Sequence, residues 1–219
     1  MKIGIIGAGN IGGTLARRLA ALGHNVSVAN SRGPESLAGL AAETGAVPTT
    51  VMEVGRDADV LIVAIPEKNI PELPDGILDS LPDSAVLIDT GNYAPKQRDG
   101  KIEELENGVV ESRWVEAHLR HPVIKAFNTI RPQSLATRGK PKGTPGRIAL
   151  PVAGEAAAGK AVVIDLVDQL GFDGIDAGRL DDSWRQQPGT PVYCADLDLA
   201  GARNALAAAT PERPSEWQA

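Results

Sequence analysis

Three glycines near the start of the chain have the spacing of a dinucleotide-binding turn. The stretch Gly7-Ala8-Gly9-Asn10-Ile11-Gly12 follows a short apolar run, Lys2 to Ile6, and precedes a segment with leucines at helical spacing. Gly7 permits a tight turn, Gly9 lets the backbone approach a pyrophosphate, and Gly12 lets the helix pack close to the strand. Free N–H groups at the start of the helix would bind the phosphates. The pattern therefore predicts a nucleotide site rather than a merely structural turn.

The end of the second apolar run, Val26 to Ala29, indicates which nucleotide. A site selective for NAD usually has Asp or Glu at this point, holding the ribose hydroxyls. This chain has Asn30-Ser31-Arg32 instead. Asn and Ser can donate hydrogen bonds to a 2′-phosphate, and a guanidinium can bind it through two charge-assisted bonds. We therefore predict NADP(H), the alternative being a polar loop with an ordinary surface arginine.

Two later apolar runs, 59–65 and 85–89, are typical of parallel strands buried on both faces. Ligands of such sheets bind beyond the carboxyl ends of the strands, so the residues at these ends are candidates for the site. Asp89 could instead accept hydrogen bonds from its own turn. The candidates for contact with the cofactor are Ala64, Ile65, Pro66 and Asn92.

Strand and helix patterns alternate along the chain, which predicts an α/β fold with a doubly wound, mostly parallel, Rossmann-type sheet and a small C-terminal extension. We expect a short helix within 70–81 and a sixth strand from Val123 running into a loop at Ile130. A helix from Ser112, capped by that residue, is expected before this strand, and a loose tail over 211–219. The predicted division is an NADP-binding domain, 1–135, and an extension, 136–219, that packs on it and completes a second pocket, unless the two form one continuous domain.

Four motifs in order, GAGNIG, NSRGPESL, DTGNY and KAFNTI, resemble the NADP oxidoreductase family whose type members are deazaflavin (coenzyme F420)-dependent NADP reductases. The resemblance covers Lys2 to about Asp198 and implies hydride transfer between NADP(H) and a deazaflavin. At Asn128 the characterised reductases tend to have His, which leaves the second cofactor open between coenzyme F420 and FMN. The resemblance implies cofactor contacts for Gly7, Ala8, Gly9, Asn10, Ile11, Ser31 and Arg32, and a second pocket lined by Phe127, Asn128, Thr129 and Ile130.

Hydride transfer between two rings depends on close stacking more than on an acid or base, so we name no catalytic residue. An alternative is a dehydrogenase or reductase of a small carbonyl, imine or hydroxy acid, for which Lys125 is the nearest candidate proton donor. Another is a non-catalytic protein that senses NADP(H). A deep second pocket would favour the enzyme, and a filled or shallow one the sensor.

The formal charge of −6 and pI near 5.1 argue against nucleic acids and anionic membranes as partners. One cysteine excludes an internal disulfide and suits the cytoplasm. His118 and His121 have no further ligands nearby in sequence, so no metal site is predicted. A basic stretch, 138–147, could close over a polyanion or be a solvated loop. The family resemblance makes a homodimer plausible.

Overall fold

Six parallel strands form the central sheet of the computed structural model, which describes residues 1–219. Their order is β3-β2-β1-β4-β5-β6, so the winding reverses between β1 and β4, where doubly wound sheets bind their ligands. The strands are β1 (Lys2–Ile6), β2 (Asn25–Ala29), β3 (Val47–Pro48), β4 (Val60–Val63), β5 (Val86–Asp89) and β6 (Ile124–Lys125). This arrangement confirms the predicted Rossmann-type α/β fold.

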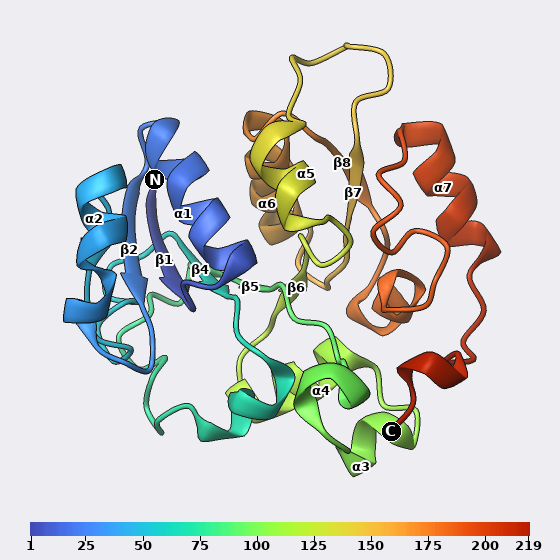
Figure 1. Ribbon diagram of the computed structural model, residues 1–219, viewed down its shortest axis with the longest axis horizontal. Helices are drawn as coiled ribbons and strands as arrows, with labels where there is room; N and C mark the ends of the chain where they lie inside the picture. The colour runs from blue at the N-terminus through green and yellow to red at the C-terminus, as the bar shows by residue number, and fades with distance from the viewer.

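Helices cover both faces of the sheet because the central strands are apolar on both sides. Leu15 of α1 packs with Ile5 in one core cluster, and Trp114 of α4 packs with Leu61 in another. Figure 1 shows α1 and α2 beside β1 and β2, with α3 and α4 near the end of the sheet to which β1 points. These helices are α1 (Asn10–Ala21), α2 (Ala38–Thr44), α3 (Glu103–Glu106) and α4 (Glu111–Leu119).

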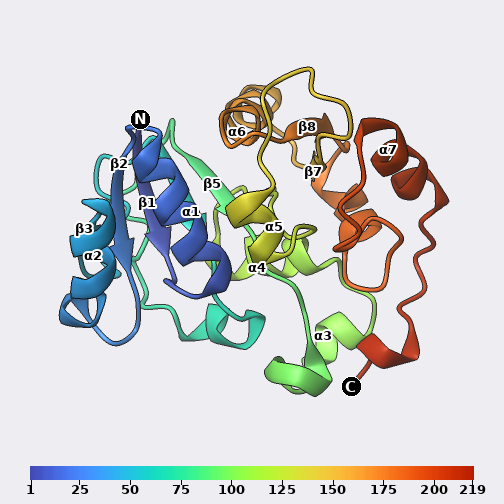
Figure 2. The ribbon, with the colours of Figure 1, turned by 45° about the horizontal axis from the view of Figure 1, so that its top comes forward.

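The C-terminal part of the chain forms a second, two-stranded parallel sheet from β7 and β8, joined by α6. An antiparallel bridge between Lys125 and Ala153 ties it to the end of the main sheet. Figure 2 shows α7 beyond this small sheet, on the far side of the molecule from α2. The elements are α5 (Pro132–Thr137), β7 (Ala149–Val152), α6 (Ala157–Gln169), β8 (Asp173–Asp176) and α7 (Leu199–Ala208). No helix has the length and hydrophobicity needed to cross a membrane.

Three local expectations are wrong. The segment 70–81 is not one helix: a 3₁₀ helix, Glu67–Glu72, is followed by turns, because Pro71 and Pro74 have no N–H to donate. The sixth strand pairs over only two residues, and Phe127 then adopts a positive φ of 62° that no strand allows. Ser112 does not cap α4, whose N-cap is Val110.

The expectation of a loose tail over 211–219 is also wrong. Arg213 donates from Nη2 to Oε1 of the buried Glu111 at 3.1 Å. The ring of Trp217 meets that of Tyr193 edge to face, with centroids 5.5 Å apart. The segment is therefore packed against α4 and against the chain that precedes α7.

Candidate functional site

A cleft of about 560 Å³ lies at the carboxyl ends of β1, β2 and β4. Of the residues predicted to contact the cofactor, it brings together Gly7, Ala8, Gly9, Asn30, Ser31, Arg32, Ala64, Ile65 and Pro66. Asn10 and Ile11 begin α1 next to this lining, whereas Asn92 lies outside it. The glycine turn and the end of β2 are thus two walls of one cavity.

The three glycines of the turn differ in backbone conformation and in the space around them. Gly7 has a φ of +103°, and a Cβ on Gly12 would collide with the carbonyl oxygen of Gly7. At Gly9 a Cβ would meet no atom within 4 Å, so the backbone there is open to a ligand. No side chain caps α1, which leaves the first N–H groups of the helix available to an anion.

The loop after β2 presents a free cation to the cleft. The Asn30 side chain shapes this loop: its Oδ1 accepts from the N–H of Arg32 at 2.9 Å, and its Nδ2 donates to Ser36 Oγ at 2.9 Å. The guanidinium of Arg32 is exposed and makes no hydrogen bond or ion pair within the chain. Ser31 and Arg32 can therefore bind a phosphate without first losing another partner.

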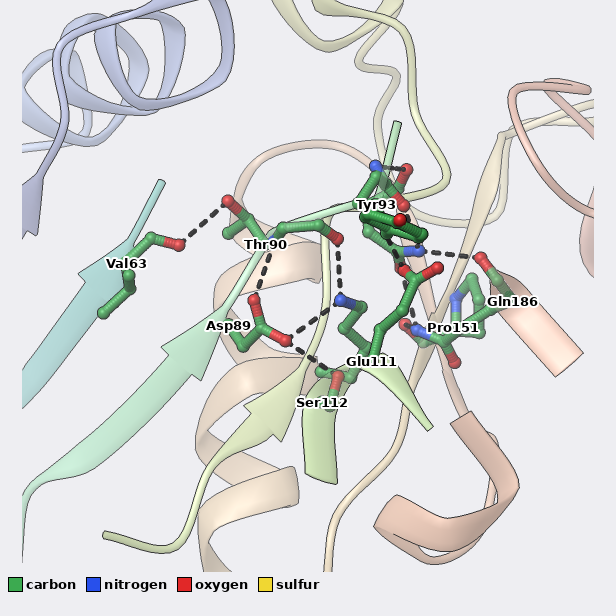
Figure 3. Close-up of polar contacts among 12 residues, drawn as sticks. Val63, Asp89, Thr90, Tyr93, Glu111, Ser112, Pro151 and Gln186 are labelled. Carbon is green, nitrogen blue, oxygen red and sulfur yellow. Dashed lines mark hydrogen bonds and ion pairs between the residues drawn. The ribbon is translucent and has the colours of Figure 1, made fainter. Parts of the chain in front are cut away.

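Beyond β5 and β6 the polar groups are paired with one another. Lys125 is fully buried and donates from Nζ to Asp89 Oδ2 at 3.0 Å and to the carbonyl oxygen of Gly91 at 2.7 Å. The other oxygen of Asp89 accepts from the N–H of Gly91 at 2.7 Å, as its own turn suggested. Ser112 Oγ also donates to Asp89, at 2.8 Å (Figure 3).

Lys125 does not reach the cleft as a proton donor. Burial opposes the charge of Lys125, but the carboxylates that face it, Asp89 first among them, outweigh burial and hold the pKa of Lys125 above its ordinary value. Its ammonium group is engaged by Asp89 and Gly91 at the end of the sheet. This observation counts against the carbonyl-reducing alternative.

The loop predicted to line a second pocket is closed in this structure. Phe127, Asn128, Thr129 and Ile130 are between 1% and 4% exposed. Asn128 Nδ2 donates to Asn92 Oδ1 at 3.0 Å and to the carbonyl oxygen of Gln186 at 2.7 Å, while its Oδ1 accepts from Gln186 Nε2 at 2.9 Å. Asn92, predicted to contact NADP(H), and Asn128, predicted to line the second pocket, lie together, and their amides bind each other and the helical turn that ends at Gln186.

The sequence analysis missed Glu67, which follows Pro66 directly and is 0% exposed. Neither of its carboxyl oxygens has a hydrogen-bond partner. Burial, followed by the carboxylate of Asp89, raises the pKa of Glu67 well above its usual range. The signal available in the sequence is an acidic residue just past the buried apolar run 59–65. Ligands of such sheets bind beyond the carboxyl ends of the strands.

The basic stretch 138–147 lies at the other end of α1 from the glycine turn. Arg18, in the last turn of α1, donates to the carbonyl oxygen of Leu170 at 2.7 Å, and Gly139 packs against the same guanidinium. Arg147 binds Asp168 at 2.7 Å and Asp173 at 2.6 Å. The stretch does not close over the cleft.

Comparison with known proteins gives the family. Residues 2–93 match the family described as NADP oxidoreductase, coenzyme F420-dependent. A hypothetical protein of known structure from Sinorhizobium meliloti is 30% identical, with a TM-score of 0.73 over 89% of this chain and 93% of that one. A candidate F420-dependent NADP reductase from Arthrobacter sp. FB24 is 25% identical, with a TM-score of 0.69 over 82% of this chain and 86% of that one.

Among curated proteins, Escherichia coli (strain K12) YjhV is 43% identical over 72 residues, which are 33% of this chain and 53% of that protein. The chain spans between about a third and about half of the length of the curated relatives it matches. The glycine turn, the end of β2 and the turn after β5 all lie within the matched family region, 2–93. Over residues 2–93 the chain belongs to the family described as NADP oxidoreductase, coenzyme F420-dependent.

Proposed function

We propose that this protein binds NADP(H) and transfers hydride between its nicotinamide and a deazaflavin- or flavin-type ring, with coenzyme F420 and FMN as the candidates. The observation that carries the proposal is the single cleft that joins the glycine turn to the unpaired guanidinium of Arg32. In this proposal residues 1–135 hold NADP(H), and residues 136–219 complete the site of the second ring.

The geometry sets the direction in which the dinucleotide lies. Arg32 follows β2, so a 2′-phosphate bound there places the adenosine over the β2 side of the sheet. The pyrophosphate crosses Gly7 to Gly9 at the start of α1. The nicotinamide then extends past the switch point toward the ends of β4, β5 and β6, where Pro66 and Asn92 lie.

The contacts of Lys125 favour ring-to-ring hydride transfer over a carbonyl reduction in which Lys125 is the proton donor. Reduction of a carbonyl or imine needs a proton donor beside the reacting atom. Lys125 is bound to Asp89 and Gly91, so it does not offer a proton to the cleft. Transfer between two stacked rings depends mainly on their alignment.

A second candidate is a protein that binds NADP(H) without turning it over. The observation that favours it is the burial of Phe127 to Ile130, which leaves almost no surface for a second ring. For the enzyme, the contacts among Asn92, Asn128 and Gln186 have to open when the acceptor binds. The two candidates share the dinucleotide site and differ only in this opening.

The test is to measure the Kd of the purified protein for NADPH and NADH, and then anaerobic hydride transfer from NADPH to coenzyme F420 and to FMN. We expect a clear preference for NADPH and oxidation of NADPH with one of the two acceptors. Tight NADPH binding with neither acceptor reduced would favour the sensor. Equal affinity for NADH and NADPH would contradict the assignment of Arg32.

A further inference from the structure

We propose that Glu67 carries a proton whose release distinguishes oxidised from reduced cofactor. Binding of NADP⁺, but not of NADPH, releases the proton of the Glu67 carboxyl group. The inference rests on the proposed NADP(H) site and deepens it. It assigns a role to a buried acid that hydride transfer itself does not require.

Glu67 is buried as an acid without a partner. It is 0% exposed, neither oxygen accepts or donates a hydrogen bond, and Oε1 lies so close to Gly91 that a Cβ there would collide with it. An ionised carboxylate in such surroundings has neither water nor a donor to stabilise it. Burial without a partner therefore favours the neutral acid, in keeping with the raised pKa that burial and Asp89 impose.

Lys125 is the cation that lowers the pKa of Glu67, but burial and the carboxylates of Asp89, Glu111 and Asp99 outweigh it. Each nearby cation is already bound to another carboxylate: Lys125 of β6 to Asp89 of β5 at 3.0 Å, Arg213 of the segment 211–219 to Glu111 of α4 at 3.1 Å, and Arg98 to Asp99 of the turn after β5 at 2.9 Å. The other titratable groups on these elements are exposed or half-buried: Lys68 and Glu72 of its own 3₁₀ helix, and Arg113, Glu116 and His118 of α4, where Arg113 is bound to Glu116 at 2.6 Å. Glu67 is thus the one carboxyl left without a counter-charge.

Glu67 adjoins the end of the cleft at which the nicotinamide would lie. Pro66, which precedes Glu67, lines the cleft. The carboxyl group of Glu67 lies against Gly91, the residue before Asn92. In the proposed orientation of the dinucleotide, the nicotinamide would lie at these strand ends. The ring of NADP⁺ has a positive charge that the ring of NADPH lacks, and charges interact strongly where water is excluded.

The oxidised ring would supply the missing counter-charge. The O–H bond of Glu67 breaks when NADP⁺ binds, the proton leaves to water, and the carboxylate remains beside the cationic ring. In turnover, NADPH and neutral Glu67 give NADP⁺, ionised Glu67, a hydride on the acceptor and one proton. A flavin- or deazaflavin-type ring needs one proton as well as the hydride to complete its reduction, so the electrons and protons balance.

Calorimetric titration of the full chain with NADP⁺ and with NADPH, in two buffers of equal pH and different ionisation enthalpy, tests the inference. We expect one ligand, NADP⁺, to release additional protons. As pH rises, the Kd for NADP⁺ should fall by up to about tenfold per pH unit, across the range in which Glu67 is protonated in the free protein and ionised in the complex. Protons linked to the 2′-phosphate are common to both ligands and cancel in the comparison.

Glu67→Gln should abolish the difference in proton release while still binding NADPH, and Glu104→Gln, which changes an exposed carboxyl on α3, should keep it. Equal proton release by the two ligands in the unaltered protein would overturn the inference and leave the NADP(H) site standing. Binding of neither ligand would overturn that site and the inference with it.

A second readout avoids any dependence on whether Glu67→Gln folds. The infrared difference spectrum between the NADP⁺ and NADPH complexes of the unaltered protein should show loss of a protonated carboxyl band on the NADP⁺ side. A spectrum without this band would also overturn the inference.

Discussion

In the proposed site, single side chains at the end of β2 would determine which dinucleotide the cleft prefers. Arg32 is the only guanidinium among the lining residues, and Asn30 holds the loop that carries it. We predict that Arg32→Ala raises the Kd for NADPH about 10- to 100-fold, because a charged hydrogen bond contributes about 1.5–3 kcal/mol. The Kd for NADH should stay nearly unchanged, since that ligand has no 2′-phosphate.

Fluorescence titration with both nucleotides checks this prediction. Arg56→Ala is the matched control, because Arg56 is exposed and lies in the turn before the amino end of β4, whereas the cleft lies at the carboxyl ends of the strands. A parallel loss of NADPH and NADH affinity in Arg32→Ala would mean that the guanidinium holds some other part of the ligand.

The two glycines that flank the start of α1 should separate ligand binding from stability. A Cβ on Gly12 would collide with the Gly7 carbonyl oxygen, so Gly12→Ala should lower the unfolding free energy by about 1–3 kcal/mol. At Gly9 the added Cβ meets no atom, so Gly9→Ala loses only the preference of the helix N-cap for glycine over alanine, about 0.5–1 kcal/mol. It should instead weaken NADPH binding. Urea unfolding and NADPH titration of both variants check the separation, which a stability loss at Gly9 as large as that at Gly12 would contradict.

At the scale of elements, the ends of β5 and β6 are held together by a buried ion pair. Only two residue pairs join these strands in the ladder, and Lys125 adds bonds to Asp89 and Gly91. We predict that Lys125→Met costs about 3–5 kcal/mol of unfolding free energy, because Asp89 is left charged and buried without its partner. Urea unfolding measures this loss.

The double variant Lys125→Met, Asp89→Asn is the control for this pair. A neutral amide at position 89 removes the unpaired charge, so the double variant should recover part of the stability lost in Lys125→Met. If the two single losses simply add, the bond from Nζ to Gly91, rather than the charge of Asp89, is what joins the strands.

Elements encoded by neighbouring residues were predictable, and those set by distant ones were not. The glycine turn and the first strands follow from spacing and apolar runs in Lys2 to Ala29 alone. β6 ends early because Phe127 leaves the strand with a φ of 62°, while the backbone of Lys125 pairs on its other side with Ala153, 28 residues farther on. The role of Ser112 of α4 could not be predicted, because its partner, Asp89, lies on β5, 23 residues earlier in the chain. The cleft could be predicted and the closed second pocket could not, since Gln186 closes it from the C-terminal part.

At the scale of the whole molecule, the buried acid should make stability depend on pH. The pKa of Glu67 is higher in the folded than in the unfolded state, so its stabilising contribution is present below the unfolded value and is lost as pH rises through the folded one. Glu67→Gln is neutral at every pH. We therefore predict that its unfolding free energy, relative to the unaltered protein, rises with pH by up to about 1.4 kcal/mol per pH unit between those two values.

Urea unfolding over a series of pH values, on protein without nucleotide, tests this dependence. Glu104→Gln controls for the loss of an exposed carboxyl. A constant difference between Glu67→Gln and the unaltered protein at all pH values would show that Glu67 titrates alike in both states. That result would also remove the neutral acid on which the proposed proton release depends.

The segment 211–219 shows how distant parts of the chain stabilise the site. Arg213 joins it to Glu111, which is fully buried and also accepts from the N–H of Tyr93 at 3.2 Å, and the guanidinium lies over the Tyr93 ring at 4.9 Å. We predict that Arg213→Ala lowers the unfolding free energy by about 2 kcal/mol. This is less than for a fully buried pair, because the Arg213 side chain is 16% exposed and the Tyr93 N–H still binds Glu111.

For a chain of this size such a loss corresponds to a Tm lower by roughly 4–8 °C, measurable by calorimetry. Arg203→Ala, on the exposed face of α7, is the control and should leave Tm nearly unchanged. Burial raises the pKa of Glu111, and Arg213 opposes that rise by stabilising the ionised carboxylate. Arg213→Ala should therefore lose more stability at neutral pH than at acidic pH, where a protonated Glu111 needs no cation. An equal loss at both would show that Arg213 acts through its contact with the Tyr93 ring, and that the segment stabilises the end of the sheet by packing rather than by charge.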